Sequence, residues 1–330
     1  MGIQAYNSSE RNCGTGIQDL LTDLPSVPAK EVHMRILLPV DGSIHSKNAI
    51  RFVASREALT AGSPTVELLN VQYLVPDLVT NMMGLEAIKA YYQAEGDKVF
   101  AELRDVIAET GLDAKEVVIS GDFGPAIAKE AERMNADLII MGTRGCTPMS
   151  GFLLGSVSSK VLAHSKRPLL LVRDKTLPLG ERLRVGICVD NSEYGRAAAE
   201  FVANNSDFFG ANTDITVINV VPYTSRLVAS DTVDMPVTLI SEDEAREAED
   251  KAFASAVEPV SAILTDAGLT PEIVRLRGKP SEAICRYAEK NLDLIIMGSH
   301  GYGNFKAAVM GSTATHIAAG CSLPLLVIRA

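Results

Sequence analysis

Short hydrophobic runs recur along the chain between stretches of helical composition. The runs are continuously apolar instead of alternating between apolar and polar positions, as in "ILLPV" at 36–40, "VELLNV" at 66–71 and "LLLV" at 169–172. Strands that are buried on both faces have this pattern, which is typical of a parallel sheet covered by helices.

The stretches between the runs predict long helices with defined ends. Segments of helical composition run from Leu85 to Ile107 and from Glu242 to Leu264. Gly111 and Gly268 follow them, and glycine just past a helix end adopts the left-handed conformation that caps helices. Strands and helices in alternation predict an α/β domain of the doubly wound type.

The second half of the chain repeats the first. "DLIIMG" occurs unchanged at 137–142 and 293–298, and "RILLPVDGS" at 35–43 corresponds to "RVGICVDNS" at 184–192. A repeat of this length is a whole domain used twice, and 330 residues suit two domains of about 150 each. We expect two tandem doubly wound α/β domains, each a five-stranded parallel sheet with helices on both faces, packed as a pseudo-dimer. The expected boundaries are a loosely ordered leader at 1–33, a first domain at 34–173, a linker at 174–181 and a second domain at 182–330.

Both halves carry one spaced glycine motif, G-x2-G-x9-G-S, directly after the "DLIIM" strand. Glycine lets backbone N–H groups approach an anion closely, and the helix that each motif opens offers unpaired N–H donors and a partial positive charge. The alternative is that the glycines only shape a turn and the serines only cap a helix. The motif residues are Gly142, Gly145, Gly155 and Ser156 in the first half and Gly298, Gly301, Gly311 and Ser312 in the second.

An aspartate follows the first strand of each half, Asp41 and Asp190. Ligands of such sheets lie beyond the carboxyl ends of the strands, where a carboxylate can accept hydrogen bonds from a base or a ribose. Its alternative role is that of a helix cap or turn residue. Neither GxxxxGK[ST] nor GxGxxG after the first strand occurs, which argues against a Walker A loop and a Rossmann dinucleotide site.

These motifs resemble the universal stress protein family, and in particular the tandem two-domain members of its ATP-binding branch. The resemblance covers nearly the whole chain. It implies that the glycine loop binds the ribose and phosphates of ATP, AMP or ADP, with Mg²⁺ held through the phosphates. It also implies that the aspartate and the backbone of a valine ending the second strand hold the adenine. The nucleotide-binding candidates are therefore Asp41, Val71, Met141, Gly142, Gly145, Gly155 and Ser156, and in the second half Asp190, Val220, Met297, Gly298, Gly301, Gly311 and Ser312.

The first half departs further from the family motif than the second. His300 keeps the histidine that the family often has in the loop, whereas Arg144 replaces it in the first half and Pro148 lies inside that loop. Asn191 stands where the first half has Gly42.

Charge and cysteine content narrow the classes of function. The net charge of −10 argues against a nucleic-acid binder, which needs a basic face. The five cysteines are scattered without metal-ligand spacing, which suits a reducing compartment. The sequence shows neither a signal peptide nor an apolar run of about 20 residues, so we expect a cytoplasmic protein that does not contact membranes.

No pattern of catalytic residues is visible. The histidines form no HExxH motif and no GxSxG occurs; Cys146 beside Arg144 is the one reactive-thiol candidate. We therefore expect an adenine-nucleotide-binding stress-response regulator that binds an unknown protein partner according to its ligand and is at most a weak ATPase. A scaffold without nucleotide and an enzyme of the adenine-nucleotide α-hydrolase type are the alternatives.

The last strands of the two halves, Leu169–Val172 and Leu325–Ile328, are apolar and would be hazardous as exposed sheet edges. We expect them to pair antiparallel across a pseudo-two-fold axis within one chain. A homodimer of whole chains is compatible with this arrangement.

Overall fold

The computed structural model describes residues 34–57, 64–143, 155–173, 182–210, 213–221, 242–299 and 310–329. The expected leader (1–33) and linker (174–181) lie outside this part of the chain, and the domain boundaries stay a prediction.

The first half has the expected alternation of strands and helices, with one additional short helix, α2. Its elements are β1 (Arg35–Pro39), α1 (Ile44–Glu57), β2 (Thr65–Gln72), α2 (Asp77–Met83), α3 (Leu85–Thr110), β3 (Ala114–Ser120), α4 (Phe123–Arg133), β4 (Leu138–Gly142), α5 (Ser156–His164) and β5 (Leu169–Val172).

The second half follows the same order, with the short α7 as its additional helix. Its elements are β6 (Arg184–Val189), α6 (Glu193–Asn204), α7 (Ser206–Phe209), β7 (Asp214–Val221), α8 (Glu242–Asp266), β8 (Glu272–Arg277), α9 (Pro280–Asn291), β9 (Leu294–Gly298), α10 (Ser312–Gly320) and β10 (Leu325–Ile328). None of the helices in the described ranges is long and apolar enough to cross a membrane.

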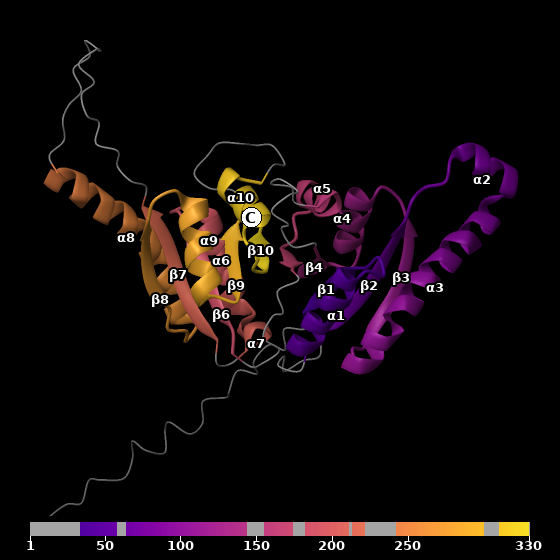
Figure 1. The fold of residues 1–330 in the computed structure, drawn as a ribbon, viewed down its shortest axis with the longest axis horizontal. Coiled ribbons are helices and arrows are strands. Elements are labelled where there is room, and N and C mark those ends of the chain that lie inside the picture. The colour runs from indigo at the N-terminus through magenta and orange to yellow at the C-terminus, as the bar shows by residue number, and fades with distance from the viewer. Residues whose placement is uncertain are drawn as a thin grey trace, which may run out of the picture. The chain divides into compact units, whose positions relative to one another are not determined.

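All the strands join one sheet in the order β3-β2-β1-β4-β5-β10-β9-β6-β7-β8 (Figure 1). The pairs within each half are parallel. At the junction β5 and β10 run antiparallel, with Leu170 opposite Leu326. The predicted pairing of the two last strands is thus confirmed, and the halves form an intramolecular pseudo-dimer.

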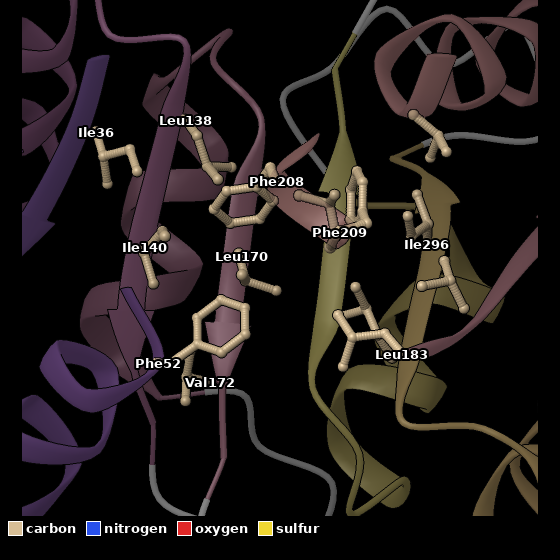
Figure 2. Packing of buried hydrophobic residues seen from close by; sticks show 14 of the residues in the cluster. Ile36, Phe52, Leu138, Ile140, Leu170, Val172, Leu183, Phe208, Phe209 and Ile296 are labelled. Atoms are coloured by element: carbon tan, nitrogen blue, oxygen red, sulfur yellow. The ribbon is translucent and has the colours of Figure 1, made fainter. Parts of the chain in front are cut away.

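Each face of the sheet is covered by its own helices. α1, α3, α6 and α8 pack on one face and α4, α5, α9 and α10 on the other, and each core cluster contains side chains from both halves. The first cluster crosses the junction, where Phe52 of α1 lies edge-on to Phe208 of α7 at a ring separation of 6.0 Å (Figure 2). The hydrophobic patterns therefore specify one continuous apolar interior on each face.

Glycines end the two long helices as predicted. Gly111 follows α3 with φ 69°, and Gly268 lies beyond α8 with φ 80°. Both values lie in the left-handed region, where glycine carries no steric penalty.

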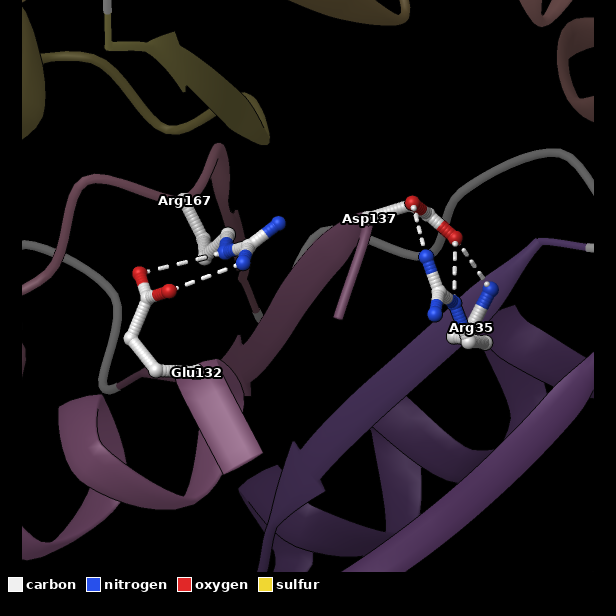
Figure 3. Close-up of polar contacts among 4 residues, drawn as sticks. All are labelled: Arg35, Glu132, Asp137 and Arg167. Carbon is white, nitrogen blue, oxygen red and sulfur yellow. Dashed lines mark hydrogen bonds and ion pairs between the residues drawn. The ribbon is translucent and has the colours of Figure 1, made fainter. Parts of the chain in front are cut away.

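The aspartate of each "DLIIMG" run holds the amino end of the sheet. Asp137 accepts hydrogen bonds from the Arg35 backbone N–H at 2.8 Å and from its guanidinium at 3.2 Å (Figure 3). Asp293 does the same for Arg184, at 3.0 and 2.8 Å. Arg167 and Glu132 form a further ion pair at 2.8 Å (Figure 3). These contacts lie at the opposite end of the strands from the predicted ligand site.

Candidate functional site

The predicted site residues that the structure describes lie at the carboxyl ends of the strands in each half. β1 lies between β2 and β4, and the chain leaves it toward β2 through α1 and reaches β4 through α4, on the other face. This is the switch point of the sheet, where doubly wound folds bind ligands. In the second half β6 lies between β7 and β9 in the same way.

Asp41 lies just before α1 and is held by two serines at the start of that helix. Its Oδ1 accepts hydrogen bonds from the Ser43 backbone N–H at 3.1 Å and from the Ser46 hydroxyl at 2.7 Å. Burial acts to raise the pKa of Asp41, but the hydrogen bonds from Ser43 and Ser46 outweigh it and hold the pKa below its ordinary value. The carboxylate is therefore ionised at neutral pH.

Asp190 lies at the equivalent position of the second half and accepts fewer hydrogen bonds than Asp41. Its Oδ1 accepts from the Ser192 N–H at 3.3 Å, while Gly195 stands where the first half has Ser46. Asn191, the departure noted in the sequence, has φ 65° and Gly42 has φ 80°. Asparagine tolerates the left-handed region better than most residues, which explains the exchange.

The backbone of Val71 faces the site. Val40 N–H donates to Leu69 O at 2.8 Å, and Gly121 N–H donates to Gln72 O at 2.9 Å. Since successive residues of a strand direct their N–H and C=O to opposite edges, Val71, like Leu69, faces the β1 side. The β1–β2 pairing ends at Leu69, so both polar groups of Val71 point beyond the end of β1.

Val220 repeats this arrangement in the second half. Gly278 N–H donates to Val221 O at 3.1 Å, so Val221 faces β8 and Val220 faces the β6 side. The strand pairing of the second half runs one residue further than that of the first, to Val189 and Asn219, and engages the N–H of Val220. Val71 therefore directs an N–H donor and a C=O acceptor beyond its partner strand, whereas Val220 directs only its C=O there.

Two buried asparagines, not anticipated from the sequence, hold the strand ends beside these valines. Asn70 Nδ2 donates to Val40 O at 2.9 Å, and Asn219 Nδ2 donates to Val189 O at 2.8 Å. Each asparagine thereby ties the second strand of its half to the end of the first strand. The asparagine that "LLNV" and "VINV" share is the signal that could have identified them.

Met141 and Met297 are buried near the ends of β4 and β9, and Gly142 and Gly298 follow them. A Cβ on Gly142 would lie 2.0 Å from the backbone oxygen of His45. Gly142 is therefore required by the close approach of α1 to β4, and the two methionines form part of the apolar interior below the site.

Gly155 and Ser156 begin α5 at the same edge. The first helical hydrogen bond runs from Ser159 N–H to Gly155 O at 2.9 Å, which leaves the N–H groups of residues 156–158 without helical acceptors. No side chain caps this helix in the described structure. Gly155 has φ −50°, and a Cβ there would meet nothing among the described atoms closer than Ser158 Oγ at 3.9 Å. Neither backbone conformation nor packing requires glycine at 155.

Gly311 and Ser312 begin α10 in the same way, again without a side-chain cap. Gly311 N–H donates to Ser299 O at 2.7 Å, so the two ends of the second glycine loop are joined directly. The interiors of both loops, with Gly145, Gly301, Arg144, Cys146, Pro148 and His300, lie outside the described residues.

Known proteins resemble the chain along most of its length. The family model described as "Universal stress protein family" matches residues 33–173 and again 181–329. A universal stress protein of Mycolicibacterium smegmatis is 24% identical over 302 residues, which is 89% of this chain and 96% of that protein. One from Thermus aquaticus is 37% identical over 139 residues, 42% of this chain and 97% of that protein.

The solved structures agree in fold. The crystal structure of a universal stress protein from Archaeoglobus fulgidus covers 89% of this chain and 98% of its own, at 24% identity and a TM-score of 0.64. With two matches of the family model, the strand order described above and this fold similarity, the chain belongs to the universal stress protein family and carries two tandem copies of its domain.

Proposed function

We propose that each half binds an adenine nucleotide (ATP, ADP or AMP) at the carboxyl edge of its strands, and that the protein acts as a stress-response regulator whose ligand state controls binding to a protein partner. One observation carries the proposal. Among the described residues, backbone N–H and C=O groups that are not used by strand pairing or by helical hydrogen bonds lie together at this edge. They come from Val71 at the end of β2 and from the first turn of α5.

The parts of a nucleotide match these groups. The N–H and C=O of Val71 form a donor–acceptor pair of the kind that the edge of an adenine ring complements, and the carboxylate of Asp41 follows β1 at the same edge. The first turn of α5 offers N–H groups and the positive end of the helix dipole to phosphates. Val220 (through its C=O), Asp190 and the start of α10 would take these roles in the second half.

Mg²⁺ would accompany the nucleotide through its phosphates. In the described ranges, no three His, Cys, Asp or Glu side chains come together as a metal site. Since Mg²⁺ is commonly held by one or two carboxylates together with substrate phosphates, this arrangement suits metal that arrives with ATP. We place the protein in the cytoplasm, where its described cysteines, all of them free thiols, would stay reduced.

Valine at both Gly155 and Gly311 should sharply weaken nucleotide binding. The added side chains would stand where backbone N–H groups approach the phosphates, while Gly155 itself has free space around its Cβ position. Isothermal titration with ATP should show two sites per chain in the wild type and a strong loss of affinity in the double variant.

Gly320→Val is the matched control for this titration. It adds the same side chain at the other end of α10, where nothing lies within 4 Å of the Cβ position, and it should bind ATP as the wild type does. Unchanged affinity and stoichiometry in the Gly155/Gly311 variant would show that the glycine loops do not hold phosphate. Mass spectrometry of protein purified without added nucleotide separates a nucleotide-bound protein from a scaffold.

Hydrolysis of ATP by the purified protein with Mg²⁺ should be far slower than the roughly 1–10³ s⁻¹ typical of enzymes. Asp41 is a poor general base because hydrogen bonds from Ser43 and Ser46 hold its pKa low. Phosphate release under saturating ATP measures the rate. A turnover within the enzymatic range that one point mutation in a loop abolishes would favour the α-hydrolase-type enzyme instead.

A further inference from the structure

Exposed apolar side chains gather in one corner of the first half. Of the nine large hydrophobic side chains that are exposed in the described part of the chain, seven lie between residues 73 and 91, and these are 49–79% exposed. They belong to the chain that leaves β2, to α2 and to the start of α3, a segment that we call the α2–α3 corner. The seven are Tyr73, Leu74, Leu78, Met82, Met83, Leu85 and Tyr91.

The α2–α3 corner extends beyond the end of the sheet. Gly96 of α3 lies against Val118 of β3, where a Cβ on the glycine would come within 2.3 Å of the valine side chain. Eleven residues of α3 precede Gly96 but only two residues of β3 follow Val118, so the helix starts about 10 Å beyond the strand (Figure 1). α2 packs against this part of α3, and none of its residues is buried. The described part of the chain therefore leaves the corner uncovered.

Hydrogen bonds hold the corner in a defined shape. The Val75 N–H donates to the Tyr92 hydroxyl at 2.8 Å, which ties the chain before α2 to α3. Gly84 ends α2, with its N–H donating to Thr80 O at 2.9 Å, and its own carbonyl accepts from the Ile88 N–H at 3.2 Å. The exposed side chains are thus presented by two directly joined helices and not by a loose loop.

The apolar surface of the corner has the size of a protein–protein interface. A large aliphatic side chain offers on the order of 100 Å² of apolar surface, so the seven together offer on the order of 700 Å². Monomeric proteins usually leave roughly 300–600 Å² in their largest apolar patch, and each partner in a standard interface buries about 800 Å². Two corners packed against each other would reach that size, and the flexible side chains of Met82 and Met83 can adapt to a facing surface.

The charges of the corner suit a second copy of the chain. Glu86 and Lys89 form an exposed ion pair at 2.9 Å on the face of α3 that also carries Leu85. Such an exposed pair contributes little energy within one chain, so its members can exchange partners. In a two-fold contact residue i meets residue j of the other copy and j meets i, so Glu86 and Lys89 complement themselves. An anionic membrane would instead attract a cluster of basic residues, and Lys89 is the only basic residue between 73 and 91.

The overall charge of the first half favours the same occupant. Residues 34–173 contain 15 Lys and Arg against 16 Asp and Glu, a net charge of −1, whereas the whole chain carries −10. The corner is part of this nearly neutral half, so two copies that meet there bring little like charge together.

We propose that two copies of the chain associate through their α2–α3 corners about a two-fold axis. Leu78 and Met82, one turn apart on the same side of α2 and 71% and 79% exposed, form the centre of the contact. The starts of the two α3 helices run antiparallel, so that Glu86 of each copy faces Lys89 of the other. This contact is separate from the β5–β10 junction, which joins the halves within one chain, and it requires no nucleotide.

Sedimentation velocity of the full chain without nucleotide tests the contact. The wild type should pass from the mass of one chain to that of two as its concentration rises. Glutamate at both Leu78 and Met82 should weaken this association roughly a hundredfold or more, because charges would replace the central apolar anchors. Both side chains are exposed, so the double variant should keep the circular dichroism spectrum and melting temperature of the wild type.

Ile273→Glu is the matched control. It makes the same kind of change at an exposed apolar side chain of β8, the last strand of the sheet at the other end, and it should associate as the wild type does. A wild type that keeps the mass of one chain at every concentration overturns the proposal. Undiminished association of the Leu78/Met82 variant, or loss of association in the Ile273 variant alone, also overturns it, because the copies then meet elsewhere.

A charge exchange tests the two-fold arrangement. Glu86→Lys and Lys89→Glu, each alone, should weaken self-association roughly fivefold, because like charges then meet twice across the axis. An equimolar mixture of the two variants should associate as strongly as the wild type, since every charge again faces its opposite. A mixture that associates no better than the separate variants contradicts the antiparallel placement of the α3 helices.

Discussion

Arginine at both Leu170 and Leu326 is expected to abolish cooperative folding or to separate the two halves of the sheet. The two leucines lie directly opposite each other in the β5–β10 pair, are 0% exposed, and belong to the core cluster that both halves share. Each arginine would leave an unpaired buried charge that costs several kcal/mol, and like charges opposite each other in a sheet add repulsion.

The total cost is comparable with the whole stability of a folded domain, roughly 5–15 kcal/mol. Urea unfolding followed by circular dichroism measures the stability, and small-angle scattering measures whether the halves stay together. Methionine at both positions is the control: it conserves volume and apolar character and should cost less than about 1.5 kcal/mol per site. An arginine variant with the urea midpoint and scattering profile of the wild type would show that this strand pair does not hold the halves together.

The same junction shows how far hydrophobic patterning determines the fold. β5 and β10 are buried at every position, and such a strand at the end of a domain cannot stay an exposed edge without risk of aggregation. Because one chain contains two such domains, the two strands can pair with each other, and neither domain is left with an exposed apolar edge strand. The parallel arrangement of the strands within each half followed from the same reasoning, because buried parallel strands are continuous apolar runs.

The hydrophobic pattern of the sequence does not reveal a helix that lies outside the core, or a buried polar side chain whose hydrogen-bond partner is far away in the sequence. None of the residues of α2 (Asp77–Met83) is buried. Its apolar side chains Leu78, Met82 and Met83 are exposed, so this helix contributes no face to the core. Arg56 of α1 is fully buried, with its guanidinium 3.4 Å from the carbonyl oxygen of Phe209 in the second half. A charged residue late in a helix would be expected at the surface. One of its acceptors, the Phe209 carbonyl, comes from across the junction between the halves, and Ser55 Oγ accepts from its Nε at 3.2 Å.

The spacing of the glycine motif located the candidate site but not the reason for each glycine. Gly142 and Gly155 belong to one motif and are equivalent in a sequence pattern. In the structure, Gly142 contacts the backbone of α1, whereas Gly155 contacts nothing closely among the described atoms. The sequence shows only that a side chain is absent at each glycine. The three-dimensional structure is needed to decide whether other protein atoms or a ligand fill the space of that side chain. The two glycines should therefore respond to substitution in opposite ways.

Alanine at Gly142 is expected to destabilise the protein strongly, by about 3 kcal/mol or more. Its Cβ would lie 2.0 Å from the oxygen and 2.3 Å from the carbon of the His45 carbonyl. These are backbone atoms in the first turn of α1, so no side-chain rotation relieves the clash and the helix has to move. The shift would also disturb the hydrogen bond from the Ser46 hydroxyl to Asp41. A lowered melting temperature and urea midpoint, without any nucleotide present, are the expected results.

Alanine at Gly155 should do the reverse: it should cost no more than about 1 kcal/mol of the free protein's stability, the usual cost of alanine at a helix N-cap, and it should reduce the stabilisation by ATP. The backbone there suits any residue, and the added methyl group has 3.9 Å to its nearest described neighbour. Bound ligand stabilises a protein by RT ln(1 + [L]/Kd), so weaker binding of ATP appears directly as a smaller rise in melting temperature. Thermal unfolding of the two variants with and without ATP measures both effects in one experiment. If the two alanines destabilise the protein equally, Gly155 is a structural glycine, and the main support for a phosphate site at α5 is removed. If the Gly142→Ala variant is as stable as the wild type, α1 does not approach β4 as closely as described.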